Sequence, residues 1–365
     1  MQKNDYGGHG GDLLAAARQF RRQPAAFIDF SSNINPLGPP QGLIEHLRQR
    51  LPEITRYPVP GAVMLRRGLA ERFSLPEERL LVGNGANELI HLLFLYLRPK
   101  TVLLPVPTFA EYARAAHLAG ALVRPLRRLP DMPPDCSAMY RELHGADFLV
   151  LCNPNNPTGE LYPPDTLTEL FAAAVRQKVT VLVDESFFPF TALPPGRSSA
   201  ALDLENLWVV TSLTKIWALP GLRLGVLAGP APALKNLSTF GDPWRVNSMA
   251  QLAGLYCLQH AEYEKKSAAA VKRERAFLAA RLARLPGLTV FSGQSNFLLL
   301  RGEEPGFQAA TLYRFLGHRG ILIRVADNFT GLDHRYFRIA VRLRRENRLL
   351  LEALTEYFTT AQEER

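Results

Sequence analysis

Short apolar runs alternate with amphipathic segments between about residues 65 and 230. The runs are almost wholly apolar, which predicts strands buried on both faces of a sheet. They cover residues 80–82, 101–104, 148–152, 179–183, 207–210 and 224–227. Helical patterns fall between most of them, as in a chain of parallel strands joined by helices. The pattern predicts an α/β fold with a mostly parallel central sheet flanked by helices.

The two ends of the chain differ from this middle part. Residues 1–40 are rich in glycine, proline and asparagine around one short helix at 13–22, and a second helix is expected at 41–51. Long helical patterns follow residue 245, and then strands mixed with helices, which indicates a smaller α+β domain. We therefore expect three parts: an arm at 1–40 packing on the small domain, a large domain at 41–245, and linking helices with the small domain at 246–365.

Composition places the chain among ordinary globular proteins. Its 365 residues are 47% hydrophobic and 21% charged, enough for one larger and one smaller domain with a sizeable core. Three scattered cysteines indicate neither a disulfide framework nor a metal cluster, and they fit a reducing cytoplasm. The longest apolar stretch, near 89–97, is too short to span a membrane, and the N-terminus lacks the apolar core of a secretion signal. A cytoplasmic protein without a metal is expected.

The formal net charge of +9 raises the possibility of nucleic-acid binding. The basic residues are dispersed, however, and their densest group (Arg342, Arg344, Arg345 and Arg348) opens a probable helix. Such a group is more typical of a solvated helix face than of a nucleic-acid surface. An enzyme acting on phosphorylated, carboxylated substrates explains the charge adequately.

Lys215 lies in a turn between two apolar runs, at the end of Thr-Ser-Leu-Thr-Lys. Burial favours the neutral amine, which is nucleophilic toward an aldehyde. Ser212 and Arg223 lie nearby in sequence, and a hydroxyl and a guanidinium can share one phosphate. A lysine beside a phosphate site is what pyridoxal 5'-phosphate requires. The alternative is a solvated loop lysine.

Three further segments follow predicted strands, at the edge where such folds bind ligands. Residues 83–88 (Gly-Asn-Gly-Ala-Asn-Glu) open a helix whose N–H groups can bind phosphate, unless they form a plain turn. Residues 153–159 form an asparagine- and proline-rich loop whose amides can donate to a phenolate oxygen. Asp184 ends a buried strand and needs a cationic partner, either a protonated pyridine nitrogen or an arginine.

Taken in order, these segments resemble those of fold type I pyridoxal-phosphate enzymes over essentially the whole chain, and most closely the relatives of histidinol-phosphate aminotransferase. The resemblance implies that Lys215 is joined to the cofactor aldehyde and that Asp184 pairs with the pyridine nitrogen. It also implies that Asn156 bonds the phenolic oxygen and that Phe109 stacks on the ring. The residues that it implies for the cofactor phosphate are Gly85, Ala86, Asn87, Ser212 and Arg223.

The resemblance extends to the substrate and to a second subunit. Arg338 is similar to the arginine that clamps the substrate α-carboxylate. Tyr57 is similar to the tyrosine that reaches the neighbouring subunit's cofactor phosphate, which implies a homodimer. One position departs from the pattern: aminotransferases of this group usually carry a tyrosine three residues after the aspartate, and here that residue is Phe187. Its loss weakens the case for ordinary transamination.

The N-terminal stretch is similar to that of the L-threonine-O-3-phosphate decarboxylases of cobalamin biosynthesis. The similar segments are Gly-Gly-His-Gly-Gly at 7–11 and the stretch at 29–38 that ends in Asn-Pro-Leu-Gly, although Asp12 stands where that family usually has asparagine. The resemblance implies decarboxylation of O-phospho-L-threonine to (R)-1-amino-2-propanol O-2-phosphate. The residues that we expect at the substrate are His9, Gly10, Gly11 and Arg324 for its phosphate and Asn33 beside Arg338 for its carboxylate. The alternative for His9 is a solvated residue of the glycine-rich arm.

Two other functions stay open at this level. The cofactor activates whichever bond at Cα stands perpendicular to its ring, so the placement of carboxylate and side chain decides between decarboxylation and transamination. A histidinol-phosphate-type aminotransferase is therefore the first alternative. A non-catalytic regulator that binds pyridoxal phosphate is the second, although such proteins usually carry a DNA-binding domain, for which few residues precede the catalytic region here.

Overall fold

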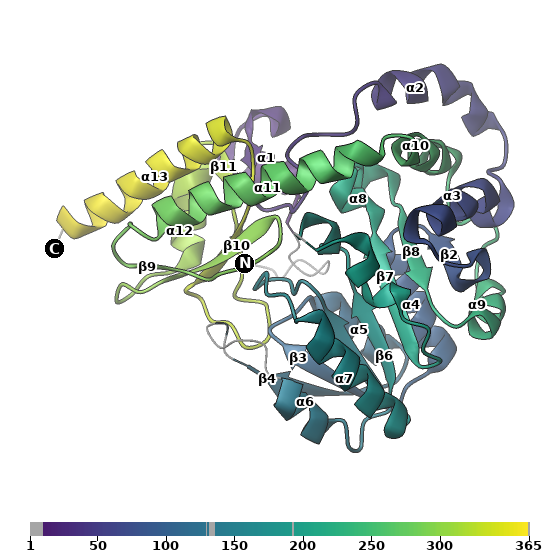
Figure 1. The fold of residues 1–365 in the computed structure, drawn as a ribbon. Helices are drawn as coiled ribbons and strands as arrows, with labels where there is room; N and C mark the ends of the chain where they lie inside the picture. The colour runs from purple at the N-terminus through teal and green to yellow at the C-terminus, as the bar shows by residue number, and fades with distance from the viewer. Residues whose placement is uncertain (1–9, 129, 131–135, 192, 364–365) are drawn as a thin grey trace.

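The computed structural model describes residues 10–128, 130, 136–191 and 193–363. Two sheets of unequal size lie side by side, and the long helix α11 (Ala261–Leu282) runs across both (Figure 1). The α/β class with a smaller α+β part, predicted from the apolar pattern, is confirmed.

The large sheet has seven strands in the order β2-β8-β7-β6-β5-β3-β4, and β8 alone runs antiparallel to its neighbours. All six predicted strands belong to it, and β4 is one that the apolar pattern did not predict. The strands are β2 (Leu80–Gly83), β3 (Thr101–Val106), β4 (Leu122–Arg127), β5 (Phe148–Cys152), β6 (Thr180–Asp184), β7 (Leu207–Ser212) and β8 (Gly225–Ala228).

Helices cover both faces of this sheet and bury alternate residues of the same strands. On β6, Val181 and Val183 contribute to the core on one face, whereas Leu182 contributes to the core on the other face. This alternation explains why the strands are apolar at every position. Helices α4 (Ala86–Leu97), α5 (Ala110–Leu118) and α9 (Ala231–Ser238) pack in the second core. Helices α3 (Val63–Phe73), α6 (Cys136–Glu142), α7 (Pro164–Arg176) and α10 (Ser248–Leu258) pack in the first.

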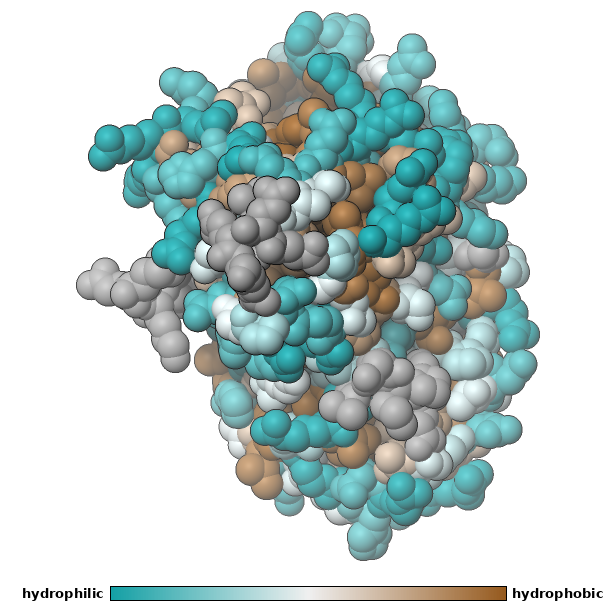
Figure 2. All heavy atoms as spheres, turned by 90° about the vertical axis from the view of Figure 1, so that its left-hand side faces the viewer, coloured by the Kyte–Doolittle hydropathy of each residue, from teal (hydrophilic) through white to brown (hydrophobic). Residues whose placement is uncertain are grey.

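The smaller sheet has four strands in the order β12-β13-β10-β9. Its hairpins are antiparallel, and two helices pack beside it, α12 (Ala309–His318) and α13 (Arg344–Glu363). The strands are β9 (Leu288–Val290), β10 (Phe297–Gly302), β12 (Arg324–Val325) and β13 (Tyr336–Ala340). Figure 2 shows the side of the molecule that carries this part, where hydrophilic residues predominate around a narrow hydrophobic band.

The N-terminal segment joins the two parts. Helix α1 (Leu13–Phe20) precedes β1 (Ile28–Asp29), which pairs in parallel with β11 (Ile321–Leu322). The Phe30 carbonyl accepts a hydrogen bond from the Ala340 amide at 2.7 Å. The chain then crosses to α2 (Leu43–Arg50) beside α10 (Figure 1). The boundaries of the three predicted parts stay a prediction.

Candidate active site

A cavity of about 530 Å³ lies at the carboxyl ends of the large sheet's strands, where the N-terminal segment and the small sheet close over them. Parallel strands present their carboxyl ends at one edge, so motifs far apart in sequence meet there. The predicted residues that line this cavity are Gly10, Gly11, Asn33, Ala86, Asn87, Phe109, Asn156, Asp184, Ser212, Lys215, Arg223, Arg324 and Arg338.

Lys215 belongs to α8 (Leu213–Ile216), a single helical turn that follows β7 directly. Burial and, to a lesser extent, the positive charges of Arg338 and Arg223 lower the pKa of its ammonium to about 8, although Asp184 opposes them. A larger neutral fraction near pH 7 makes the amine a better nucleophile. Lys215 is therefore not a solvated loop lysine.

Asp184 ends β6 and is almost completely buried. One carboxylate oxygen accepts a hydrogen bond from the Tyr112 hydroxyl at 2.8 Å, and the other accepts one from the Ser186 amide at 2.8 Å. Burial raises the pKa of this carboxyl, and the two hydrogen bonds oppose the rise. Among the described residues no arginine forms an ion pair with Asp184. The described residues thus give this buried carboxylate hydrogen bonds and the electrostatic attraction of Lys215, but no ion pair.

The first turn of α4 and two hydroxyls form a pocket for an anion. Gly85 precedes this helix at φ +88°, and a Cβ there would lie 2.6 Å from an Nη atom of Arg223. Glycine therefore lets the guanidinium approach the helix N-terminus, where N–H groups are available for an anion. Ser212 Oγ and Thr214 Oγ1 lie 2.8 Å apart at the start of the helical turn that carries Lys215.

Phe109 and Asn156 also line the cavity. Phe109 is the N-cap residue of α5, and its ring lies 5.5 Å from that of Tyr112, edge to face. The side-chain oxygen of Asn156 accepts a hydrogen bond from Nη1 of Arg338. This bond leaves the amide nitrogen of Asn156 as the group that can donate to a ligand.

Two arginines face the cavity from the small sheet. Arg338 on β13 and Arg324 on β12 are direct partners in the antiparallel register. Burial lowers the pKa of Arg338 to about 9, with Arg324 as a further cause, and burial lowers the pKa of Arg324 to about 10. Within the described part of the chain neither forms a salt bridge with a carboxylate. Two paired guanidinium groups that face a cavity are suited to anionic ligands.

The N-terminal segment supplies one wall of the cavity. The Ser31 carbonyl accepts a hydrogen bond from Nη2 of Arg338 at 2.9 Å, and a Cβ on Gly10 would lie 2.2 Å from that same oxygen. Gly10 therefore permits close packing beside the arginine. The side-chain oxygen of Asn33 is buried without a hydrogen-bond partner in the described residues.

Three predicted residues are not among those that line the cavity, and one of them, Gly85, directly precedes the lining residue Ala86. His9 falls outside the described residues, so the structure says nothing of its position. Tyr57 is 81% exposed and does not line the cavity; its ring lies 4.8 Å from that of Trp244.

Tyr112 and Ser186 are functional candidates that the sequence reasoning missed. Tyr112 follows Phe109 by three residues, which places both side chains on one face of α5 once a helix starts at Ala110. That spacing was a usable signal. Ser186 follows Asp184 by two residues, so its amide folds back onto the carboxylate. No sequence pattern distinguishes this turn from others.

These residues fit pyridoxal 5'-phosphate. The unpaired buried carboxylate of Asp184 suits a protonated ring nitrogen, and the glycine-permitted approach of Arg223 to α4 suits the phosphate. The amine of Lys215, with its lowered pKa, suits the aldehyde. The individual roles of the predicted residues stay a proposal.

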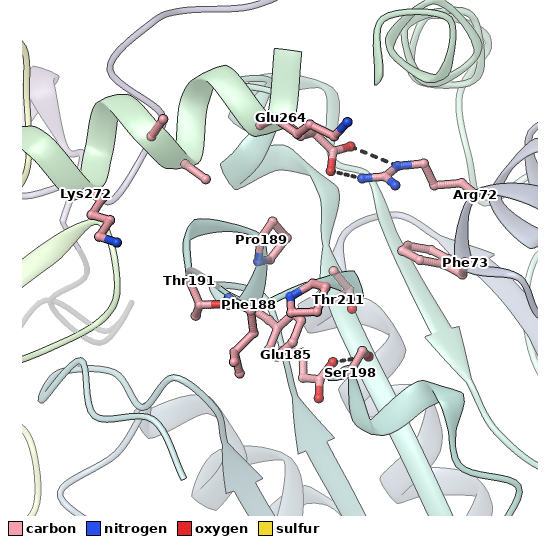
Figure 3. Close-up of a pocket in the computed structure, with 15 residues that line it drawn as sticks. Arg72, Phe73, Glu185, Phe188, Pro189, Thr191, Ser198, Thr211, Glu264 and Lys272 are labelled. Atoms are coloured by element: carbon pink, nitrogen blue, oxygen red, sulfur yellow. Dashed lines mark hydrogen bonds and ion pairs between the residues drawn. The ribbon is translucent and has the colours of Figure 1, made fainter. Parts of the chain in front are cut away.

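A second cavity, of about 470 Å³, lies between the segment that follows β6 and helix α11 (Figure 3). Phe188 and Pro189 line it from the large domain, and Glu264 and Lys272 line it from α11. Its walls are mainly apolar, and no residue predicted for cofactor or substrate lines it.

Among the described residues, no cluster of three or more histidine, cysteine, aspartate or glutamate side chains is arranged to bind a metal. No helix in the described ranges has the length and apolarity needed to cross a bilayer.

Comparison with known proteins gives consistent results. Threonine-phosphate decarboxylase of Salmonella typhimurium is 36% identical over 96% of both chains. Histidinol-phosphate aminotransferase of Symbiobacterium thermophilum is 34% identical over 90% of this chain and 89% of its own. The crystal structure of L-threonine-O-3-phosphate decarboxylase from Porphyromonas gingivalis superposes with a TM-score of 0.80 at 31% identity, covering 90% of this chain and 98% of its own.

The resemblance to both groups of enzymes, expected from the motifs, is confirmed by these relatives. The sequence profile described as Aminotransferase class I and II matches residues 25–354. That match covers all strands of both sheets and every α-helix from α2 to α12. The chain belongs to the aminotransferase class I and II family, and it is a pyridoxal-phosphate enzyme of that family.

Proposed function

We propose that this enzyme decarboxylates O-phospho-L-threonine to (R)-1-amino-2-propanol O-2-phosphate for cobalamin biosynthesis. The observation that carries the proposal is the direct pairing of Arg324 and Arg338 on β12 and β13. Like charges directly opposite each other destabilise a sheet unless something neutralises them. O-phospho-L-threonine carries two anionic groups, a carboxylate and a phosphate, whereas histidinol phosphate carries a phosphate only.

Two further observations support decarboxylation over transamination. The wall beside the cofactor site carries Phe187, whose ring packs edge to face on Phe297 at 5.0 Å. A phenylalanine there cannot donate the hydrogen bond that a tyrosine would give to a phenolic oxygen. Among the relatives, the decarboxylase from Salmonella typhimurium covers more of this chain than the aminotransferase from Symbiobacterium thermophilum does.

The mechanism that we infer assigns separate tasks to the cavity residues. Bound pyridoxal phosphate supplies an electron sink for the pair left at Cα when CO₂ departs. Asp184 holds a proton on the ring nitrogen. Arg338 binds the substrate carboxylate, and Arg324 with the amides of Gly10 and Gly11 binds the phosphate. Two anchored groups limit rotation about Cα, so that the bond to the carboxylate is held in the reactive orientation.

Lys215 completes the reaction in this proposal. Its amine has a lowered pKa of about 8, so near neutral pH it can both give and accept a proton. After CO₂ leaves, Lys215 delivers a proton to Cα, and the amine product is released.

The test is an incubation with O-phospho-L-threonine in the absence of any 2-oxo acid. We expect CO₂ and the phosphorylated aminopropanol in equal amounts over many turnovers. The matched incubation contains histidinol phosphate and 2-oxoglutarate, and we expect little glutamate from it. A keto acid from phosphothreonine, with the cofactor left as pyridoxamine phosphate, would contradict the proposal in favour of an aminotransferase.

We also propose that two copies form a dimer across the surface around Tyr57. Exposed apolar side chains are concentrated between residues 44 and 64, and Trp244 lies beside Tyr57. Such a concentration is unusual for a surface that faces water. They are Ile44, Leu51, Ile54, Tyr57, Val59, Met64 and Trp244. A tyrosine that is 81% exposed on this surface is available to reach a second copy's cofactor phosphate.

A further inference from the structure

The turn that carries Lys215 is held by a residue from the N-terminal segment. Asn35 is only 3% exposed, and its backbone amide donates to the Lys215 carbonyl at 3.1 Å. Its side-chain amide donates to the next carbonyl, that of Ile216, at 2.7 Å. Carbonyls in the last turn of a helix lack partners within it. Asn35 therefore donates hydrogen bonds to two carbonyls of α8 that have no partner within this four-residue helix.

The same asparagine also contacts the long helix α11. Its side-chain nitrogen lies 2.8 Å from both Tyr263 Oη and Ser267 Oγ. Its side-chain oxygen accepts a hydrogen bond from the Leu37 amide at 3.1 Å, which fixes the orientation of the amide group. One buried side chain thus joins the N-terminal segment, the lysine turn and the helix that runs across both sheets.

A second contact holds the turn on the same helix. Trp217 follows Lys215 by two residues, is fully buried, and donates its indole N–H to Glu264 at 3.0 Å. Glu264 in turn forms an ion pair with Arg72 at the end of α3, as Figure 3 shows. The first two turns of α11 therefore hold the lysine turn through Asn35 and through Trp217.

We propose that Asn35 is a positioning residue that fixes the Lys215 turn against α11, so that the lysine amine stays inside the cavity facing Asp184. Its effect passes through the backbone of α8, because it touches the carbonyls of Lys215 and Ile216 and not the amine. The inference concerns capture of the cofactor and holds whichever substrate the enzyme uses. When the turn is held, the Lys215 amine interacts electrostatically with Asp184, Arg223 and Arg338. These charges, together with burial, set the pKa of the amine.

The test measures how fast cofactor-free protein forms the lysine–cofactor linkage, followed by absorbance over a range of pH. In the unaltered protein we expect the rate to rise with pH through a midpoint near 8, where Lys215 loses its proton. Asn35→Ala keeps the backbone bond to the Lys215 carbonyl but loses the side-chain bonds to Ile216 and α11. The turn is then held less firmly and the amine gains access to water, so the midpoint moves upward toward the ordinary value of 10.5. A rise of about one pKa unit slows capture at pH 7 about tenfold.

A milder variant and two controls separate positioning from general loss of stability. Asn35→Ser leaves a smaller gap and keeps one hydroxyl, so it is expected to fold and to show the same shift at reduced size. Tyr256→Phe removes a tyrosine hydroxyl that bonds the Gln41 carbonyl and neither Asn35 nor α8. Asn206→Ala removes a side-chain bond to the Val179 carbonyl at the opposite end of β7. Both controls are expected to lower the melting temperature and to leave the midpoint near 8.

Two results would overturn the inference. One is an unchanged midpoint and capture rate in both Asn35 variants, with only a lower melting temperature. The other is an equal shift in Tyr256→Phe and Asn206→Ala. Because no substrate enters this experiment, its outcome is separate from that of the decarboxylation assay.

Discussion

At the residue scale, the site depends on groups whose protonation is set by burial. Asp184 and Lys215 both lie at strand ends, and burial shifts their pKa values in opposite directions, upward for the acid and downward for the amine. Those shifts bring both groups closer to neutral pH, as catalytic groups require. Their positions could be predicted from sequence because each follows a recognisable apolar strand.

Tyr112 provides a test of how Asp184 is kept charged. In Tyr112→Phe the hydrogen bond to the carboxylate is lost, so the pKa of Asp184 rises further and the charged form is lost at higher pH. The acid limb of the activity profile is therefore expected to move to higher pH. A bond to a charged group contributes about 1.5–3 kcal/mol, so cofactor affinity is expected to fall about 10- to 100-fold.

The measurement is a spectral titration of cofactor-free protein with pyridoxal phosphate, together with a pH profile of turnover. Phe109→Leu serves as a comparison, since it removes an aromatic wall without altering the bonds to Asp184. It should weaken binding and leave the acid limb in place. An unaltered acid limb in Tyr112→Phe would show that Asp184 does not depend on this hydroxyl.

Arg324 provides a test of the substrate phosphate site. In Arg324→Met we expect KM for O-phospho-L-threonine to rise about 10- to 100-fold, because a charge-assisted bond to phosphate is lost. Cofactor binding should not change, since Arg324 lies on the small sheet. Steady-state kinetics and cofactor titration measure the two effects, and Arg314→Met on the exposed face of α12 is the control. Equal KM values for the two variants would remove Arg324 from the phosphate site.

At the element scale, buried elements could be predicted and exposed ones could not. All six strands of the large sheet that are buried on both faces show as apolar runs. Strand β4 lies at the sheet edge, carries Arg124, Pro125 and Arg127, and is partly exposed throughout, so no apolar run marks it. Helix α11 begins at Ala261, and its first two turns make polar contacts through Tyr263, Glu264 and Ser267, which an apolar pattern does not reveal.

Helix α10 offers a test of a capping interaction. The side-chain oxygen of Asn247 accepts a hydrogen bond from the Ala250 amide at 2.8 Å at the start of this helix. Asn247→Ala is expected to lower the free energy of unfolding by about 1 kcal/mol, because that amide loses its partner. Asn247→Asp keeps the acceptor and should cost much less. Denaturant unfolding of the cofactor-free protein measures both, and equal losses would show that the cap does not stabilise the helix.

At the scale of the whole molecule, contacts between distant segments were beyond the sequence pattern. The pairing of β1 with β11 joins two-residue strands from the two ends of the chain, and neither is long enough to give a period. The pairing of Arg324 with Arg338 likewise depends on the register of β12 and β13. The sequence indicated Arg324 and Arg338 as two separate candidates for substrate binding, and the fold shows that they lie opposite each other.

The dimer is tested at this scale by charging the surface around Tyr57. Ile54→Glu and Met64→Glu place carboxylates on side chains that are 60% and 56% exposed in the single chain. If a second copy covers them, burying an unpaired charge there is strongly unfavourable, and the dimer is expected to dissociate. Sedimentation velocity measures this. Leu118→Glu is the control, since that side chain is 62% exposed at the end of α5. A protein that sediments as a single chain before any change would contradict the dimer.

The most direct measurement follows the fate of the hydrogen on Cα. O-phospho-L-threonine labelled with deuterium at Cα is converted by the enzyme in ordinary water, and the product is analysed by mass spectrometry. Decarboxylation breaks the bond to the carboxylate, so we predict that the amine product keeps the deuterium and gains one hydrogen from the solvent. Loss of the deuterium together with formation of a keto acid would contradict the proposed function.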